Sequence, residues 1–164
     1  DYEKTLEYYM KSKGIDENLN HQNTAGYSSL MTNIGNVYER KGDYDRAMEY
    51  YMKSKEIKDN LKLQNTAGYG GLMSNIGIVY LRKGDNKKAM EYYLKDREIK
   101  DRLRLQNTAD YGIVLFNIAL MYKNQNDKKM AGEYFRKSYE TYVKAGFKGA
   151  KRDEALKNAE MLGY

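Results

Sequence analysis

The sequence contains no cysteine, no proline and no tryptophan, and its only histidine is His21. Without cysteine the chain has no disulfide framework, no thiolate metal site and no thiol nucleophile. The absence of proline argues against a loop-rich sandwich and favours continuous helix. No apolar run is long enough to span a bilayer, and no signal-like segment opens the chain. We therefore expect a cytoplasmic protein that holds no metal and no cofactor.

The charged residues are numerous and mixed in sign. Lysine and arginine total 29, aspartate and glutamate total 23, and the net charge of +6 admits an anionic partner. Acids and bases alternate at helical spacing, as in Glu49 and Lys53, which is typical of solvated helix faces with pairs along one helix. No basic surface motif interleaved with aromatic residues is present, so the sequence disfavours a nucleic-acid partner.

The strongest signal is an internal repeat with a period of 42 residues. The string QNTAGY occurs twice and QNTADY once, each 42 residues after the one before. Residues 22–63 and 64–105 share 29 identities in 42 positions, and residues 106–147 keep 16 of 42 against the second copy. A period of about 20–50 residues is typical of a solenoid of stacked units.

Each copy predicts two antiparallel helices. Apolar residues such as Leu30 and Ile34 recur at the 3.6-residue period and mark one buried helix face. Asn23 or Thr24 can cap the start of this first helix, and Gly42 supplies a left-handed residue at its end. A second apolar stripe follows after a two-residue break, which makes the two helices antiparallel neighbours.

These pairs predict an all-α fold in one array over residues 1–164. Residues 1–21 correspond to the second half of an incomplete repeat, and residues 148–164 supply a C-terminal capping helix. We expect eight helices: one without a partner at the start, three pairs, and a last one near residues 150–162.

Small and aromatic residues recur at fixed spacings in every copy. The motif of the first copy is Ile34-Gly35-x2-Tyr38-x3-Gly42-x4-Ala47-x3-Tyr51. The second copy has Ile76, Gly77, Tyr80, Gly84, Ala89 and Tyr93, and the third has Ile118, Ala119, Tyr122, Ala131 and Phe135. This spacing resembles that of the tetratricopeptide repeat (TPR) family. The resemblance covers nearly the whole chain and implies a right-handed α-solenoid, a TPR-like superhelix.

The sequence departs from the family pattern at two places. The usual tryptophan of the first helix is replaced by Met31, Met73 and Leu115, and the closing proline by Asp59 and Asp101. Without that proline the second helix can run about two turns longer. Such lengthened units resemble those of the spindle-orientation adaptor LGN, of kinesin light chain and of bacterial Rap-type regulators. The resemblance implies a non-catalytic scaffold for a protein or peptide ligand.

One asparagine per repeat has no packing reason to recur. Asn33, Asn75 and Asn117 each precede a buried isoleucine, about 100° around the helix from it, so we expect them on the inner curve of the superhelix. One reading is a hydrogen bond to the neighbouring helix. The other is a ladder of amides that grips the backbone of an extended peptide, since stacked helices lie about 8–10 Å apart and three extended residues span about 10 Å. In the extended TPR adaptors, asparagines at matching positions contact bound peptide, and this resemblance favours the ladder.

The same spacing predicts the neighbours of the ladder in a peptide-binding groove. These are Asn36, Arg40, Ser74, Ile78, Arg82, Ile113, Phe116, Leu120 and Asn124. We expect a ligand with a polar or acidic part near Arg40 and Arg82 and an apolar anchor near Phe116. The alternative for the apolar end is contact with the final helix.

Two other functions remain open, and catalysis is not expected. Leu6, Tyr9 and Met10 form an apolar flank without a cover, which indicates either a preceding repeat or a homodimer through the incomplete repeat. The array could also be the regulatory arm of a larger signalling enzyme. No phosphate loop, HExxH or GxSxG motif is present, and His21 aligns with leucines in the other copies, so we expect no enzyme.

Overall fold

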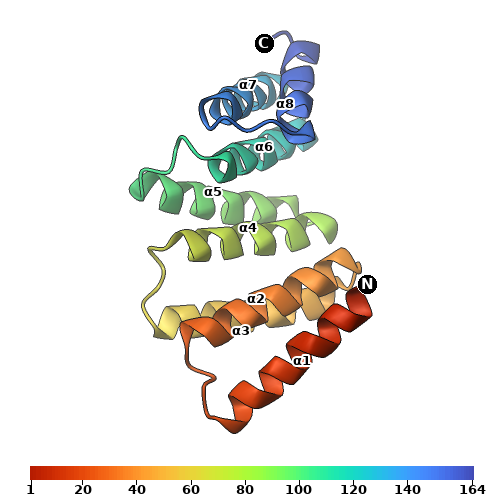
Figure 1. Ribbon diagram of the computed structural model, residues 1–164. Coiled ribbons are helices and arrows are strands. Elements are labelled where there is room, and N and C mark those ends of the chain that lie inside the picture. Colours follow the sequence, from red (N-terminus) through yellow and green to blue (C-terminus); the bar gives the residue numbers. More distant parts are fainter.

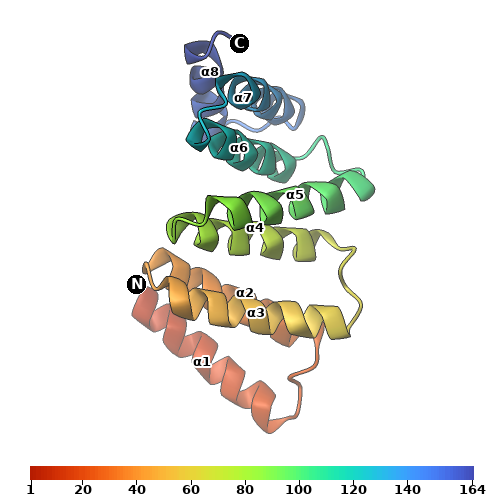
Figure 2. The same ribbon diagram turned by 180° about the vertical axis from the view of Figure 1, so that it is seen from behind.

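The computed structural model describes residues 1–164 and contains eight α-helices and no strand. They are α1 (Tyr2–Asn18), α2 (Ala25–Arg40), α3 (Tyr44–Asn60), α4 (Ala67–Arg82), α5 (Asn86–Arg102), α6 (Ala109–Asn124), α7 (Lys128–Lys144) and α8 (Ala150–Met161). The helices are stacked in chain order from α1 at one end to α8 at the other, in an elongated body (Figure 1; Figure 2, from behind). The all-helical solenoid expected from the sequence is therefore confirmed. None of the eight helices combines the length and the apolar character needed to cross a membrane.

Repeated capping residues fix where the helices begin. The first helices start after Thr24, Thr66 and Thr108, whose hydroxyls each accept a hydrogen bond from a backbone N–H in the first turn. The side chains of Asp43 and Asp85 do the same for α3 and α5. Such caps satisfy donors that the helix itself leaves free. The threonine, rather than the preceding asparagine, is the cap in every copy.

Left-handed residues end the helices. Gly42 and Gly84 close α2 and α4 with φ of 79° and 83°. Lys62 and Arg104 close α3 and α5 with φ of 57°, a region that side-chain-bearing residues seldom adopt. The helix pairs thus turn back at fixed points although the chain contains no proline.

The core lies between the two helices of each pair and between neighbouring pairs. Ile34, Tyr51, Ile76 and Tyr93 are all at most 1% exposed. A Cβ atom at Gly35 would lie 2.6 Å from the ring of Tyr51, so a larger residue there would force the helices apart. Gly35 therefore allows α2 and α3 to approach each other closely.

The C-terminal segment covers the last pair. Ala155 and Ala159 of α8 are fully buried in a cluster with side chains of α6 and α7. The ring of Tyr164 lies over α7, so close to Gly132 that a Cβ there would collide with it. The α8 helix therefore acts as a cap whose remaining face is largely charged and exposed.

A tyrosine–carboxylate pair joins each second helix to the next first helix. The hydroxyl of Tyr69 in α4 donates to Asp59 in α3 at 2.8 Å, and that of Tyr111 donates to Asp101 at 2.7 Å. Tyr27 makes the same contact with Glu17 at 2.9 Å. The aspartates that replace the family's closing proline thus hold the joint between consecutive pairs.

Candidate functional site

The first helices carry the three asparagines that the sequence singled out, but in three different environments. Asn33 of α2 is exposed, and its amide makes no hydrogen bond within the chain. Asn75 of α4 is half-buried and uses only its Nδ2 atom. Asn117 of α6 is 7% exposed. Accessibility therefore falls from the first repeat to the third.

Asn36 connects two consecutive pairs through one oxygen atom. Its Oδ1 accepts a hydrogen bond of 2.8 Å from the hydroxyl of Tyr51 and another of 2.9 Å from Nδ2 of Asn75. Asn75 fits both interpretations of the recurring asparagines. Its amide nitrogen forms a hydrogen bond to a neighbouring helix, and its carbonyl oxygen makes no hydrogen bond in the chain and can accept one from a peptide.

One repeat later the acceptor is missing. Ile78 stands where Asn36 stands in the first copy, and the hydroxyl of Tyr93, the counterpart of Tyr51, is buried without a hydrogen-bond partner. Burial raises the pKa of Tyr93, so its hydroxyl keeps its proton. Asn117, the counterpart of Asn75, has no acceptor at this position either.

A hollow of about 400 Å³ lies between α1 and α2. Its lining residues are Asp1, Tyr2, Thr5, Tyr9, Asn33, Asn36, Val37 and Arg40. Three residues predicted for the groove, Asn33, Asn36 and Arg40, therefore line one cavity. The lining is mostly polar, with hydroxyl, amide and guanidinium groups that can bind a polar ligand group.

The charged and apolar neighbours extend this surface. Arg40, Arg82 and Asn124 are exposed at the ends of α2, α4 and α6, and neither arginine forms an ion pair within the chain. Ile78 and Leu120 are half-buried and pack on the same core cluster, and Ile113 is half-buried against the next cluster. A cationic guanidinium near a helix C-terminus is also favoured by the helix dipole.

Besides Asn117, two predicted neighbours of the amide ladder are buried. Ser74 is 9% exposed and donates to the carboxylate of Asp96, which is fully buried and also paired with Lys100. Its helical position turns it toward α5, the second helix of its own pair. Ser74 therefore contributes to packing between two helices and does not line the surface beside the ladder.

Phe116 is likewise unavailable as an anchor for a ligand. It is 2% exposed, its ring meets that of Phe135 edge-on at 5.3 Å, and Lys151 of α8 lies over it at 4.9 Å. Lys123 also donates to Asn158 of α8 at 2.9 Å. The final helix thus covers the apolar end, as the alternative reading of the sequence had it.

Sequence reasoning missed the part of α1 that lines the hollow. Tyr2, Thr5 and Tyr9 of α1 line it, and of these the sequence indicated only Tyr9, as part of an apolar flank. The signal was present, because Tyr9 stands 42 residues before Tyr51, but its meaning depends on the contact between Tyr51 and Asn36. No cluster of histidine, cysteine, aspartate or glutamate side chains that could hold a metal ion is present.

The family model of the tetratricopeptide repeat matches residues 28–61, 71–95 and 114–142, which is more than half of the chain. The chain belongs to this family. Tetratricopeptide repeats are in general non-catalytic scaffolds for interactions between proteins. No curated protein matches the sequence.

Solved structures share the fold at low sequence identity. The nearly identical TPR-like repeats of a putative kinesin light chain from Podosopora anserina align with a TM-score of 0.78, 11% identity, 98% of this chain and 77% of that one. The N-terminal domain of stress-induced protein-1 (STI-1) from C. elegans aligns with a TM-score of 0.64 and 17% identity, over 85% of this chain and 97% of that one. BtubC (BKLC) from P. vanneervenii aligns with a TM-score of 0.66 and 17% identity over 84% of this chain. The alignment spans 65% of the length of BtubC.

Proposed function

We propose that the chain binds a peptide segment of a partner protein along the surface formed by α2 and α4. Asn33 and Asn75 grip the peptide backbone, and Arg40 and Arg82 attract an acidic part of the ligand. The observation that carries this proposal is the free hydrogen-bonding capacity of the two amides: Asn33 makes no hydrogen bond in the chain, and Asn75 leaves its carbonyl oxygen unused. Asparagine lowers helix stability, and exposed Asn33 has no packing role that would offset this cost, which favours a binding role.

The third repeat contributes less than the first two. Asn117 is 7% exposed, and the ring of Phe116 is covered by α8. The half-buried side chains of Ile78, Ile113 and Leu120 form the apolar part of the binding surface. Asn124 is exposed at the end of α6. The proposed binding surface therefore runs from the hollow beside α1 to the start of the third repeat.

The test begins with a peptide selected from a random displayed library against the wild-type protein. Asn33→Ala and Asn75→Ala should each weaken its binding about three- to tenfold, the value of one hydrogen bond to a peptide group. Asn60→Ala, which removes an exposed amide from the end of α3, is the matched control and should leave the affinity unchanged. Circular dichroism verifies that helicity is retained. Equal affinities for all four proteins would refute the amide ladder.

A second candidate function is self-association through α1. Several of its side chains are unusually exposed for their type: Tyr2 at 47%, Tyr8 at 70%, Ile15 at 60% and Leu19 at 57%. Large apolar side chains exposed together on one helix favour a protein contact. Sedimentation equilibrium over a wide concentration range tests the candidate, and a monomer at the highest concentration would eliminate it.

A further inference from the structure

The same residue types are buried in α3 and exposed in α1. Tyr50 of α3 is 8% exposed and its ring stacks on that of Tyr38 in α2 at 5.6 Å. Tyr8 stands 42 residues earlier in α1 and is 70% exposed. Ile57 is partly buried in the core, whereas its counterpart Ile15 is 60% exposed. The exposed face of α1 is therefore the face that α3 presents to the first helix of its own pair.

Two hydrogen-bond donors converge beside this face without an acceptor. In the next repeat the equivalent donors, Tyr51 and Asn75, both reach the side-chain oxygen of Asn36. Their counterparts one period earlier are Tyr9 and Asn33, which both line the hollow of about 400 Å³ and make no hydrogen bond within the chain. In the first repeat the side-chain oxygen of Asn36 accepts from both donors. Beside α1 the two equivalent donors are present, but no side-chain oxygen accepts from them.

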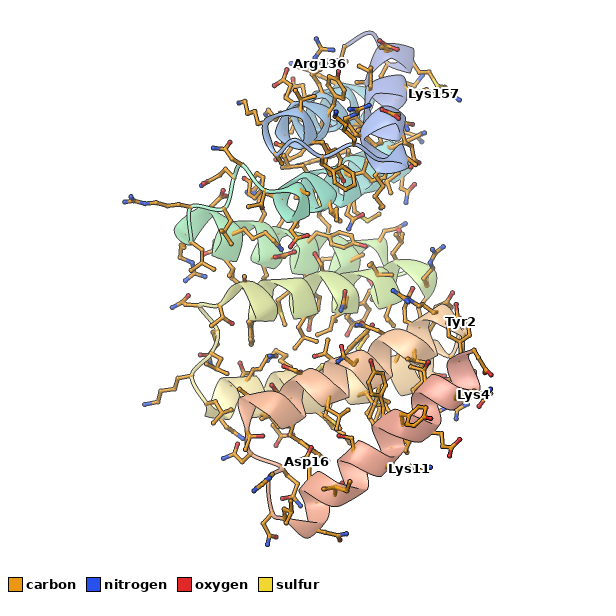
Figure 3. The ribbon with its side chains drawn as sticks, in the orientation of Figure 1. Tyr2, Lys4, Lys11, Asp16, Arg136 and Lys157 are labelled. Carbon is orange, nitrogen blue, oxygen red and sulfur yellow. The ribbon has the colours of Figure 1, made fainter.

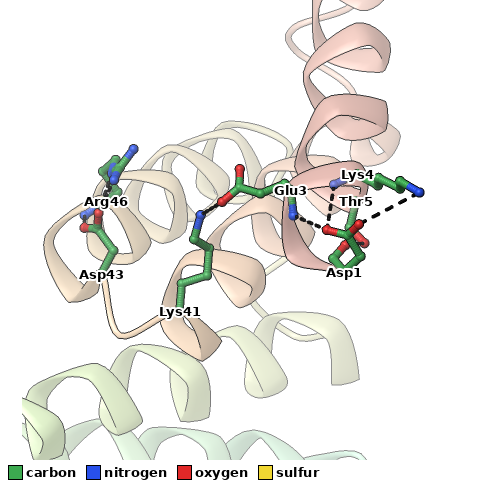
Figure 4. Close-up of polar contacts among 7 residues, drawn as sticks. All are labelled: Asp1, Glu3, Lys4, Thr5, Lys41, Asp43 and Arg46. Carbon is green, nitrogen blue, oxygen red and sulfur yellow. Dashed lines mark hydrogen bonds and ion pairs between the residues drawn. The ribbon is translucent and has the colours of Figure 1, made fainter.

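The hollow is held in shape by contacts between the two helices that form it. Glu3 in the first turn of α1 forms an ion pair with Lys41 at the end of α2 (Figure 4). The Asp1 side chain caps α1 by accepting from the backbone N–H groups of Glu3 and Lys4. Figure 3 shows Tyr2 and Asp16 toward opposite ends of α1, at the end of the stack far from α8. These contacts join the start of α1 to the end of α2, the two helices that carry Tyr9 and Asn33.

We propose that this face of α1 binds an amphipathic helix of a partner that carries the pattern Asn-x-Tyr, as in Asn36-Val37-Tyr38. The asparagine oxygen of the bound helix accepts hydrogen bonds from Tyr9 and Asn33. Its tyrosine ring stacks on Tyr8, and its apolar stripe covers Ile15. A single helix that packs on α1 as α2 packs on α3 can make all of these contacts at once. This site shares Asn33 and the hollow with the proposed peptide surface, whereas Tyr8, Tyr9 and Ile15 belong to this site alone.

The probe is a fluorescent peptide of residues 22–41 of this chain, which carries the pattern, added to the full-length protein. Anisotropy should report saturable binding. The Asn36→Ile peptide, which has the residue found naturally at position 78, should bind about three- to tenfold more weakly, because both donors then lose their acceptor. A peptide of residues 64–83 offers a second, natural control with isoleucine at this place.

The protein variants separate this site from the groove. Tyr9→Phe should weaken binding of the Asn36-containing peptide about three- to tenfold and leave the Asn36→Ile peptide unaffected, since the two changes remove the same contact. Tyr8→Phe, one residue away, keeps its stacking ring and should not alter the affinity. The proposed function assigns no role to Tyr9, whose hydroxyl makes no hydrogen bond in the free protein, so thermal melting of Tyr9→Phe should match that of the wild type.

Three results would overturn the proposal. The first is the absence of saturable binding. The second is equal affinity of the Asn36 and Asn36→Ile peptides, or equal effects of Tyr8→Phe and Tyr9→Phe, either of which would indicate a non-specific apolar contact or replacement of α2 by the peptide. The third is a concentration-dependent dimer that the peptide does not displace and that Tyr8→Ala dissolves, which would make a second copy of the chain the occupant.

Discussion

The hydroxyl of Tyr51 donates a hydrogen bond of 2.8 Å to Oδ1 of Asn36. The ring of Tyr51 is 1% exposed, and burial raises the pKa of its hydroxyl, which stays protonated as a donor. Its counterpart Tyr93 has the same buried ring but meets Ile78 and has no partner. Two tyrosines at the same repeat position therefore contribute differently to stability.

Removing each hydroxyl should reveal this difference. Tyr51→Phe should lower the free energy of unfolding by about 1–2 kcal/mol, because it breaks a buried hydrogen bond to an amide. Tyr93→Phe should cost nothing or stabilise by a few tenths to about 1 kcal/mol, because it removes a buried polar atom that has no partner. Urea unfolding followed by circular dichroism gives both values. Equal losses for the two variants would contradict the assignment of Tyr93 as unpartnered.

Supplying the missing acceptor should be tolerated. Ile78→Asn introduces at the second repeat the amide that in the first accepts from Tyr51 and Asn75, whose counterparts are Tyr93 and Asn117. Two new hydrogen bonds should offset the lost apolar contact, so that the free energy of unfolding changes by less than about 1 kcal/mol. The control is Ile76→Asn, two residues away and 0% exposed, which buries an amide without partners and should cost more than about 3 kcal/mol. The same large loss at both positions would refute the prediction.

The tyrosine–carboxylate joint should give a stability that depends on pH. Burial alone would raise the pKa of Asp59, but hydrogen bonds from Lys55 and Tyr69 outweigh it and hold that pKa below its ordinary value. A carboxylate with a lowered folded-state pKa stabilises fully above the unfolded pKa of about 4, and this contribution is lost as pH falls through the folded value.

Asp59→Asn should therefore cost about 1 kcal/mol at pH 7, and the difference from the wild type should shrink below about pH 4. Denaturant unfolding at several pH values measures it. Glu56→Gln removes an exposed carboxylate of the same helix that forms no ion pair and serves as the control. A loss for Asp59→Asn that is independent of pH would exclude the ionised carboxylate as its source.

Two buried lysines at equivalent positions should respond in opposite ways to the same substitution. Lys100 is paired with the fully buried Asp96, whereas Lys58 is 7% exposed, has Ser54 in place of that aspartate, and has its pKa lowered by burial. Lys100→Met leaves a buried carboxylate without its partner and should cost about 3 kcal/mol or more. Lys58→Met removes an amine that has no carboxylate partner and should be neutral or stabilising. Thermal or urea unfolding separates the two, and a similar loss in both would show that Lys58 has an anionic partner after all.

The sequence alone predicts the helical solenoid because its signals are local and repeated. Thr24 and Asp43 cap the starts of helices and Gly42 ends one, each through contacts within one helical turn. The period of 42 residues repeats most of these capping signals along the chain. The small residue at Gly35 likewise predicts close packing, since a glycine in a helix otherwise lowers stability.

The site is predicted only in part, because the direction of a side chain depends on neighbours that the repeat pattern does not fix. Ser74 and Phe116 occupy one repeat position, but the first binds Asp96 and the second is covered by α8, whose sequence does not follow the repeat. The role of Tyr9 depends on a contact between two pairs, which becomes visible only when Tyr51 and Asn36 are seen together.

Uniform joints have a consequence for how such an array can change its length. If residues 64–105 were excised, Leu63 would run into Gln106 and Asp59 would meet Tyr111, with the same tyrosine–carboxylate chemistry as before. The shortened chain would also set Asn117 beside Asn36, giving that amide the acceptor it now lacks. Gain or loss of a whole unit, by unequal recombination for instance, therefore requires no new interface, and a shorter array would be locally better matched than its parent.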